Sequence, residues 1–401
     1  MLTSLAFVFL AGLLMAAVCK RLKLPGIIGM LITGIVLGPY VLDLLDPSIL
    51  SVSSDLRQMA LIIILLKAGL SLDLSDLKKV GRPAIMMSCV PASCEILAFF
   101  MLAPSLLGVT RIEAAVMGAV LAAVSPAVVV PRMVRLMDEK YGTKKSIPQL
   151  ILAGASCDDI FVIVLFSTFS GMAQGGHANV MGFVNIPVSI VLGIALGAAA
   201  GFVLSVFFEI SYAHRHCVRN SVKVIIVLGV SFLLMAVETW LKGIVSVSGL
   251  LAVVSMACVI RIRCVPQVTA RLSEKFGKLW LAAEVILFVL VGAAVDIRYT
   301  LEAGIAAVAM IFAALIFRGI GVSLCLVKTS LSFKERLFCI IAYLPKATVQ
   351  AAIGSVPLAM GLPCGKIVLS VAVLAILITA PLGAIGIDSA YKKLLTHDEN
   401  S

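Results

Sequence analysis

Long apolar stretches alternate with short polar connections along almost the whole chain. Thirteen stretches reach the roughly 17 residues that a membrane-crossing helix needs. They lie near residues 1–19, 25–42, 55–72, 82–107, 111–136, 146–173, 184–210, 221–241, 245–262, 275–296, 301–327, 334–359 and 365–387. The period-2 alternation over about ten residues that marks transmembrane strands is absent, so the stretches are expected to be helices. The pattern predicts an all-α polytopic membrane protein with about 13 transmembrane helices.

The composition supports this class. Of 401 residues, 61% are hydrophobic and only 13% are charged, whereas soluble domains are about half apolar. The first apolar stretch has neither a basic start nor a clear cleavage site, so we interpret it as a retained helix and not as a signal peptide.

Basic residues concentrate in alternate connections between the stretches. These connections hold 24 of the 32 Lys and Arg residues. The connections on the other side hold five: Arg57, Arg111, Lys242, Arg298 and Lys366. By the positive-inside rule, we expect the N-terminus outside and the C-terminus in the cytoplasm. The net charge of +11 is explained in this way, so no nucleic-acid partner is expected.

Two adjacent carboxylates, Asp158 and Asp159, interrupt the stretch 146–173. A charged residue at the bilayer centre costs about 2.5–3.5 kcal/mol on insertion scales, so such residues are functional candidates. Neighbouring helix positions point about 100° apart, so one basic partner does not easily neutralise both. Four other ionisable residues in or near the stretches are interpreted as structural: Lys67, Glu209, Glu238 and Glu284.

Helix-breaking residues interrupt the fifth and the twelfth stretches. The fifth contains "AVLAAVSPAVVVPRM", in which Pro126 and Pro131 are expected to break the helix. The twelfth contains "IAYLPKATVQAAIGSVP", with a break expected at Pro345. Because the two stretches are seven apart, they have opposite orientations, and stretches 2–6 and 9–13 form a candidate inverted repeat. Transporters commonly build their substrate site at the crossing of two such discontinuous helices.

The polar residues around these breaks suit a hard monovalent cation. Such a cation prefers oxygen ligands, and we assign Asp159 as the Na⁺ ligand with Asp158 beside it. Ser125 and Thr348 offer neutral oxygens, while Lys346 is placed to offset the negative helix ends at the crossing. Because the same carboxylate also binds a proton, competition between Na⁺ and H⁺ for it couples the two fluxes.

Three motifs, "GASCDDI", "AVSPAVVVP" and "LPKATVQAAIGS", closely resemble those of the sodium/proton antiporters of the cation/proton antiporter superfamily. The match is with the two-aspartate branch found in bacteria and animals, and it covers essentially the whole chain. The resemblance implies a homodimer in membrane lipid and an elevator-like motion, with Asp159 as principal cation and proton ligand and Asp158 as its partner. It also implies a scaffold of residues 1–80 and 221–297, a mobile core of residues 81–175 and 301–388, and a linking helix at 184–210.

Arg318, in "ALIFRGIGV", occupies the position where many relatives carry a lysine. A buried arginine stays charged and needs a partner. Glu95, in "PASCEILAF", and Asp158 are the two candidates, and we favour Glu95.

Other functions fit the sequence less well than cation/proton exchange does. A K⁺/H⁺ antiporter is close, but such proteins usually append a nucleotide-binding domain, and none is expected here. A sodium-coupled solute symporter shares crossed broken helices, but it builds its sodium sites mainly from neutral oxygens and single acids. An intramembrane aspartyl protease needs a G-x-G-D context that is not found in this sequence, and a channel is disfavoured by the adjacent acids. We therefore expect a transporter of Na⁺ or Li⁺ and H⁺, not an enzyme, with no cofactor.

Overall fold

The computed structural model describes residues 1–71, 81–174, 180–213, 220–241, 247–296 and 304–397, and all named elements in it are helices. Nine of the helical stretches in these ranges are long and apolar enough to cross a membrane, and shorter apolar helices accompany them. The predicted all-α polytopic membrane fold is confirmed. The exact number of thirteen crossings stays a prediction.

The chain divides into two compact units, described here one at a time. The first comprises Met1–Arg57, Asp73–Val162 and Val285–Ser401, and the second comprises Gln58–Leu72 and Ile163–Glu284. Three helices pass from one unit into the other: α4 (Ser53–Ser71), α10 (Ile147–Gln174) and α14 (Pro266–Ala293).

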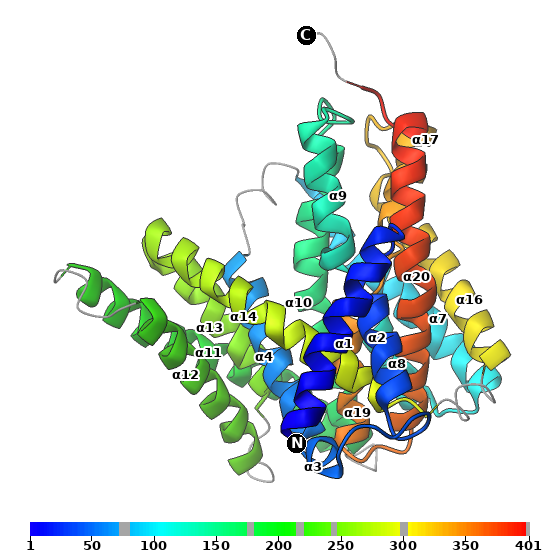
Figure 1. Cartoon of the computed structure of the whole chain (residues 1–401). Coiled ribbons are helices and arrows are strands. Elements are labelled where there is room, and N and C mark those ends of the chain that lie inside the picture. Colours follow the sequence, from blue (N-terminus) through cyan, green and yellow to red (C-terminus); the bar gives the residue numbers. More distant parts are fainter. Residues whose placement is uncertain (72–80, 175–179, 214–219, 242–246, 297–303, 398–401) are drawn as a thin grey trace. The chain divides into compact units, whose positions relative to one another are not determined.

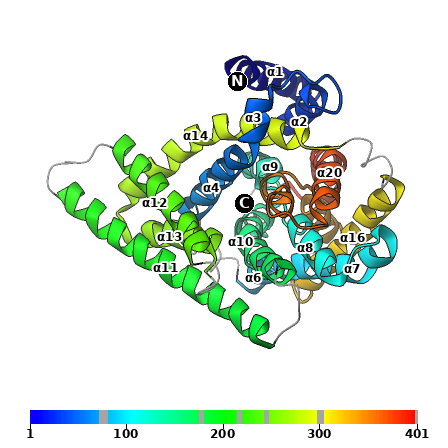
Figure 2. The ribbon, with the colours of Figure 1, turned by 90° about the horizontal axis from the view of Figure 1, so that it is seen from below.

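The first unit contains most of the helices (Figure 1). They are α1 (Leu2–Arg21), α2 (Gly26–Leu37), α3 (Pro47–Ser51), α6 (Arg82–Met87), α7 (Val90–Leu107), α8 (Arg111–Leu121), α9 (Pro126–Asp138), α16 (Gly304–Cys325), α17 (Phe333–Ala342), α18 (Thr348–Gly354), α19 (Val356–Ala359) and α20 (Gly365–Leu394). Figure 2 shows α7, α8, α9, α10, α16 and α20 gathered around one another. The second unit adds three helices, in which α13 packs along α11 and α12: α11 (Val180–Ala213), α12 (Asn220–Trp240) and α13 (Gly249–Arg263).

Both predicted helix breaks are present. Residues 122–125 separate α8 from α9, and residues 343–347 separate α17 from α18. Pro126 is the first residue of α9, where its missing N–H is harmless because the first N–H groups of a helix have no intrahelical acceptor. Pro345 lies inside the second break.

The prediction that Pro131 breaks the helix is wrong, because α9 continues through it. A proline inside a helix removes one backbone hydrogen bond and bends the axis, but the turns on either side still form their own bonds. An interruption that the sequence did not predict separates α6 from α7 at Ser88 and Cys89. Their side chains donate to the carbonyl oxygen of Ile85, at 2.7 and 3.5 Å respectively.

One helix boundary differs from the prediction at a basic end, the start of α14. The sequence pattern predicts that this span starts near residue 275 and that Arg271, Lys275 and Lys278 are among the basic residues of the preceding connection, but α14 begins at Pro266 and includes all three. Glu274 and Lys278 lie one turn apart and form a 2.7 Å ion pair, so this polar end is compatible with a helix although it is too charged to read as a membrane span. Other basic residues used for the orientation lie outside the described residues: Lys78, Lys79, Arg215, Arg219, Lys242 and Arg298.

Glycines allow α2 to approach the end of α14 at backbone distance. A Cβ on Gly34 would meet the Val289 carbonyl group and would lie 2.9 Å from the Ala293 nitrogen. Gly292 faces Gly34 across this contact, with 3.1 Å between its Cβ position and the Gly34 Cα. Small residues at such contacts are typical of membrane helices, which associate by close packing.

Gly34→Ala is expected to lower the free energy of unfolding by about 1–3 kcal/mol, because overpacking forces the two backbones apart. The measurement is thermal unfolding of the detergent-purified protein, followed by circular dichroism. Gly229→Ala on α12 is the control, since its Cβ would meet no atom within 4 Å. An equal loss of stability in both variants would contradict the close contact.

Candidate ion-binding site

The two helix breaks lie against each other. The Ser125 N–H in the first break donates to the Pro345 carbonyl in the second at 2.8 Å. Gln350, on α18, donates its side-chain N–H to the carbonyls of Leu121 at 3.3 Å and Ala123 at 2.7 Å. Each break therefore satisfies backbone groups that the other leaves free, as is required where no water is present.

Asp158 is fixed at the first break. Its Oδ2 accepts the Val124 N–H at 2.7 Å and an N–H from Arg318 Nη2 at 3.3 Å, and the residue is fully buried. Its carboxylate therefore binds the backbone that precedes α9, where the helix presents its positive end. These contacts offset part of the cost of burying the carboxylate.

Asp159 has a different environment on the same helix. It is 7% exposed, and its Oδ1 is buried without a hydrogen-bond partner among the described residues. A buried carboxylate without partners is costly as an anion. Asp159 is thus a group that a proton or a cation would neutralise.

Arg318 joins the acidic residues of the site. Its Nη1 donates to Glu95 Oε2 at 2.8 Å, and its Nη2 donates to Asp158. The same guanidinium donates to the carbonyl of Ala122 and, through Nε, to that of Tyr343 at 2.6 Å. The predicted Glu95–Arg318 pair is confirmed. The prediction that Arg318 pairs with only one of the two acids is wrong, because it also binds Asp158. A planar guanidinium with five N–H donors reaches both acids.

Lys346 shares Glu95 with Arg318. Its Nζ lies 2.8 Å from Glu95 Oε2 and 2.5 Å from the carbonyl oxygen of Leu121, the last residue of α8. Its backbone N–H donates to the Thr379 hydroxyl on α20 at 3.0 Å. The ammonium therefore sits at the negative end of α8, where the sequence placed a counter-charge.

The formal charges of the five ionisable groups nearly balance. Arg318 and Lys346 carry two positive charges, and Glu95, Asp158 and Asp159 carry three negative charges when all are ionised. Because Arg318 and Lys346 both bind Glu95, and Arg318 also binds Asp158, the uncompensated charge falls on Asp159. One monovalent cation or one proton there would make the cluster neutral.

The two predicted neutral ligands are also buried at the breaks. Ser125 immediately precedes α9, and its hydroxyl is fully buried without a partner among the described residues. Thr348 is the first residue of α18 and is 3% exposed. Within the part of the chain that the structure describes, neither hydroxyl bonds to Asp159.

Three residues of this site were not assigned a role from the sequence: Gln350, Tyr343 and Thr379. Gln350 had a signal, because an amide in an apolar half-helix next to a break is costly unless it binds backbone. Tyr343 and Thr379 had none, because their roles depend on which helices pack against the second break.

Two acids interpreted as structural bind backbone N–H groups in the second unit, and their structural role stays a prediction. Glu209 accepts the Val265 N–H at 2.8 Å, next to the start of α14. Glu238 accepts the Gly249 N–H at 2.9 Å, at the start of α13. Lys67 Nζ lies 5.9 Å from the ring centroid of Trp280, and its structural role stays a prediction.

An all-helical membrane protein with buried acids at two crossed helix breaks has the architecture of a membrane transporter. The family model described as "Sodium/hydrogen exchanger, transmembrane" matches residues 5–392, so the chain belongs to the sodium/hydrogen exchanger family. It is accordingly an integral, multi-pass membrane protein.

Known proteins resemble the chain along nearly its whole length. Sodium/hydrogen exchanger 9B2 of Homo sapiens is 34% identical over 390 residues, which cover 94% of this chain and 71% of that protein. Sodium/hydrogen exchanger 9B1 of Homo sapiens is 32% identical, covering 93% of this chain and 73% of that one. The sodium proton antiporter MjNhaP1 from Methanocaldococcus jannaschii has the same fold, with a TM-score of 0.81, 22% identity, and coverage of 98% of this chain and 99% of that one.

Glu95→Gln is expected to lower the free energy of unfolding by about 3–5 kcal/mol, because Arg318 and Lys346 lose the buried charge that they share. The measurement is thermal unfolding of the purified protein. Glu274→Gln is the control, because it removes an ion pair at the exposed end of α14 and is expected to leave the melting temperature nearly unchanged. An unchanged melting temperature in Glu95→Gln would contradict the shared ion pair.

Proposed function

We propose that this protein exchanges Na⁺ or Li⁺ for protons across a membrane, by competition of the cation and the proton for Asp159. The observation that carries the proposal is the uncompensated carboxylate of Asp159 beside a cluster whose other charges are paired. The names of the relatives, sodium/hydrogen exchangers and a sodium proton antiporter, agree with this cargo. Potassium as cargo, or symport of a solute, receives no support from those names.

The residues of the site fall into those that bind the ion and those that hold the site together. Asp159 binds Na⁺ in one state and H⁺ in the other, while Ser125 and Thr348 contribute neutral oxygens to the cation. Asp158 stays ionised and orients the first break through the Val124 N–H. Arg318 and Lys346 hold the crossing together and do not touch the ion. No resident cofactor takes part.

Alternating access would carry this site from one side of the membrane to the other. We propose that residues 81–175 and 301–388 form the moving core and that residues 1–80 and 221–297 form the scaffold, which dimerises with a second copy. The helix at 184–210 links the two. We propose from the basic connections that the N-terminus lies outside and the C-terminus lies in the cytoplasm.

Asp159→Asn is expected to abolish exchange, because an amide neither takes up the proton nor carries the charge that binds Na⁺. The measurement is the internal pH of proteoliposomes after addition of Na⁺, Li⁺, K⁺ or choline. Asp158→Asn is expected to retain reduced exchange, since Asp158 orients the site and does not carry the cargo. Asp55→Asn, at an exposed position on α4, is the control. Robust Na⁺-driven proton flux in purified, folded Asp159→Asn protein would overturn the assignment.

The exchange is expected to be one H⁺ for one Na⁺, because Asp159 alone holds the uncompensated charge of the cluster. Flux would then be independent of membrane potential. The measurement is Na⁺ flux in vesicles with a fixed pH gradient and a clamped potential. A zero-flux point that moves with the potential would mean that a second group, with Asp158 the first candidate, also exchanges its proton.

A further inference from the structure

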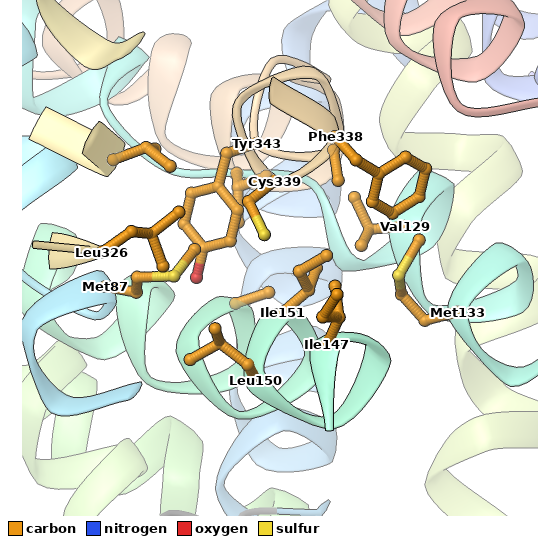
Figure 3. Packing of buried hydrophobic residues seen from close by; sticks show 14 of the residues in the cluster. Met87, Val129, Met133, Ile147, Leu150, Ile151, Leu326, Phe338, Cys339 and Tyr343 are labelled. Carbon is orange, nitrogen blue, oxygen red and sulfur yellow. The ribbon is translucent and has the colours of Figure 1, made fainter. Parts of the chain in front are cut away.

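Tyr343 is the first residue after α17, and it lies fully buried at the start of the second break. Figure 3 shows its ring among Met87, Leu326 and Leu150, in an apolar cluster outside the charged groups of the site. Its hydroxyl has no hydrogen-bond partner among the described residues. The proposed exchange mechanism gives this side chain no role.

The hydroxyl of Tyr343 rests directly on α10 at Gly154. A Cβ at Gly154 would clash with that oxygen, and it would also lie 3.0 Å from the Met87 Cβ and 3.3 Å from the Tyr343 Cζ. A side chain larger than glycine's hydrogen would therefore clash with the Tyr343 hydroxyl at this height on the helix. Gly154 precedes Asp158 by four residues, which is about one helical turn.

The other side of Tyr343 contacts Arg318. The Tyr343 carbonyl accepts from Arg318 Nε at 2.6 Å, and the guanidinium carbon lies 5.5 Å from the centroid of the Tyr343 ring. That distance is within the range of a cation–π contact. Since Arg318 also donates to Asp158, the contacts close a loop: Gly154 to Tyr343, Tyr343 to Arg318, Arg318 to Asp158, and Asp158 back along α10 to Gly154.

We propose that Tyr343 is a positioning residue for ion exchange. It rests on Gly154 and holds Arg318 at the height of Asp158, and so sets the geometry of the two adjacent aspartates. The inference rests on the proposed function for its consequence in transport, but its geometric part stands on the contacts alone. The ring and the backbone carbonyl do the positioning, and the hydroxyl only occupies the space above Gly154.

Gly154→Ala tests this arrangement, because the added methyl group must displace either the tyrosine or α10. Alanine favours a helix more than glycine does, so any harm comes from the contact and not from helix propensity. Tyr343→Phe removes the oxygen that the methyl would meet, so the double variant should relieve the displacement. Gly171→Ala is the matched control on the same helix, since its Cβ would meet nothing within 4 Å.

The four variants and the unaltered protein are compared in proteoliposomes for half-saturating Na⁺ and for the pH profile of exchange. Gly154→Ala is expected to raise the half-saturating Na⁺ at least fivefold and to shift the pH profile. The double variant is expected to return to within twofold of Tyr343→Phe alone, and Gly171→Ala is expected to stay within twofold of the unaltered protein. Thermal unfolding of the same proteins gives a second double-mutant cycle, this time for stability. In it, the double variant is expected to regain the stability that Gly154→Ala loses.

Three results would overturn the proposal. The first is a double variant as impaired as Gly154→Ala. The second is a Gly154→Ala protein that is less heat-stable but has unchanged half-saturating Na⁺ and pH profile, which would make the contact merely structural. The third is an equal defect in Gly171→Ala. If the unaltered protein itself shows no cation-driven flux, the proposed function fails, and the thermal cycle alone decides whether Tyr343 and Gly154 are coupled.

Discussion

A helix that is interrupted inside a membrane leaves backbone groups with no water to bind, and the structure of this site follows from that constraint. The carbonyls of Leu121, Ala122 and Ala123 end the first half-helix. Arg318 supplies its donor from α16, and Lys346 and Gln350 supply theirs from the second break and from α18. In return, Asp158 accepts the Val124 N–H on the other side of the break. Polar side chains are therefore needed at the crossing before any ion enters it.

Satisfying the breaks with charged donors creates a second requirement, because two buried cations need buried anions. Glu95 serves both Arg318 and Lys346, and Asp158 serves Arg318 as well. This leaves Asp159, one position further along α10, as the acid of this cluster for which the described part of the chain shows no hydrogen-bond partner. Two adjacent residues therefore have different roles. Asp158 takes part in the structural hydrogen bonds and ion pairs, and Asp159 is the proposed ligand of the transported ion.

The positions of the charged groups also depend on close packing between uncharged residues. Gly34 and Gly292 allow α2 and α14 to touch through their backbones, and Gly154 leaves space for the Tyr343 hydroxyl. Because close-packed interiors resist small displacements, the spacing between helices and the position of the charged groups are not independent. The break at residues 343–347 is held by hydrogen bonds on one face and by the apolar cluster around Tyr343 on the other.

Sequence patterns alone predict the apolar helices, both main breaks and the adjacent acids Asp158 and Asp159, because these depend on local properties: hydrophobicity, proline geometry and the cost of charge in lipid. They do not predict that Pro131 lies within a continuous α9, that α14 begins at Pro266, or that Arg318 binds two acids. The ion pairs follow from long-range packing, since Arg318 meets Glu95 across 223 positions of sequence and Lys346 meets the same acid across 251. Helix packing decides which acids lie within reach of a guanidinium. Packing depends on the whole folded chain, so a local sequence pattern does not predict it.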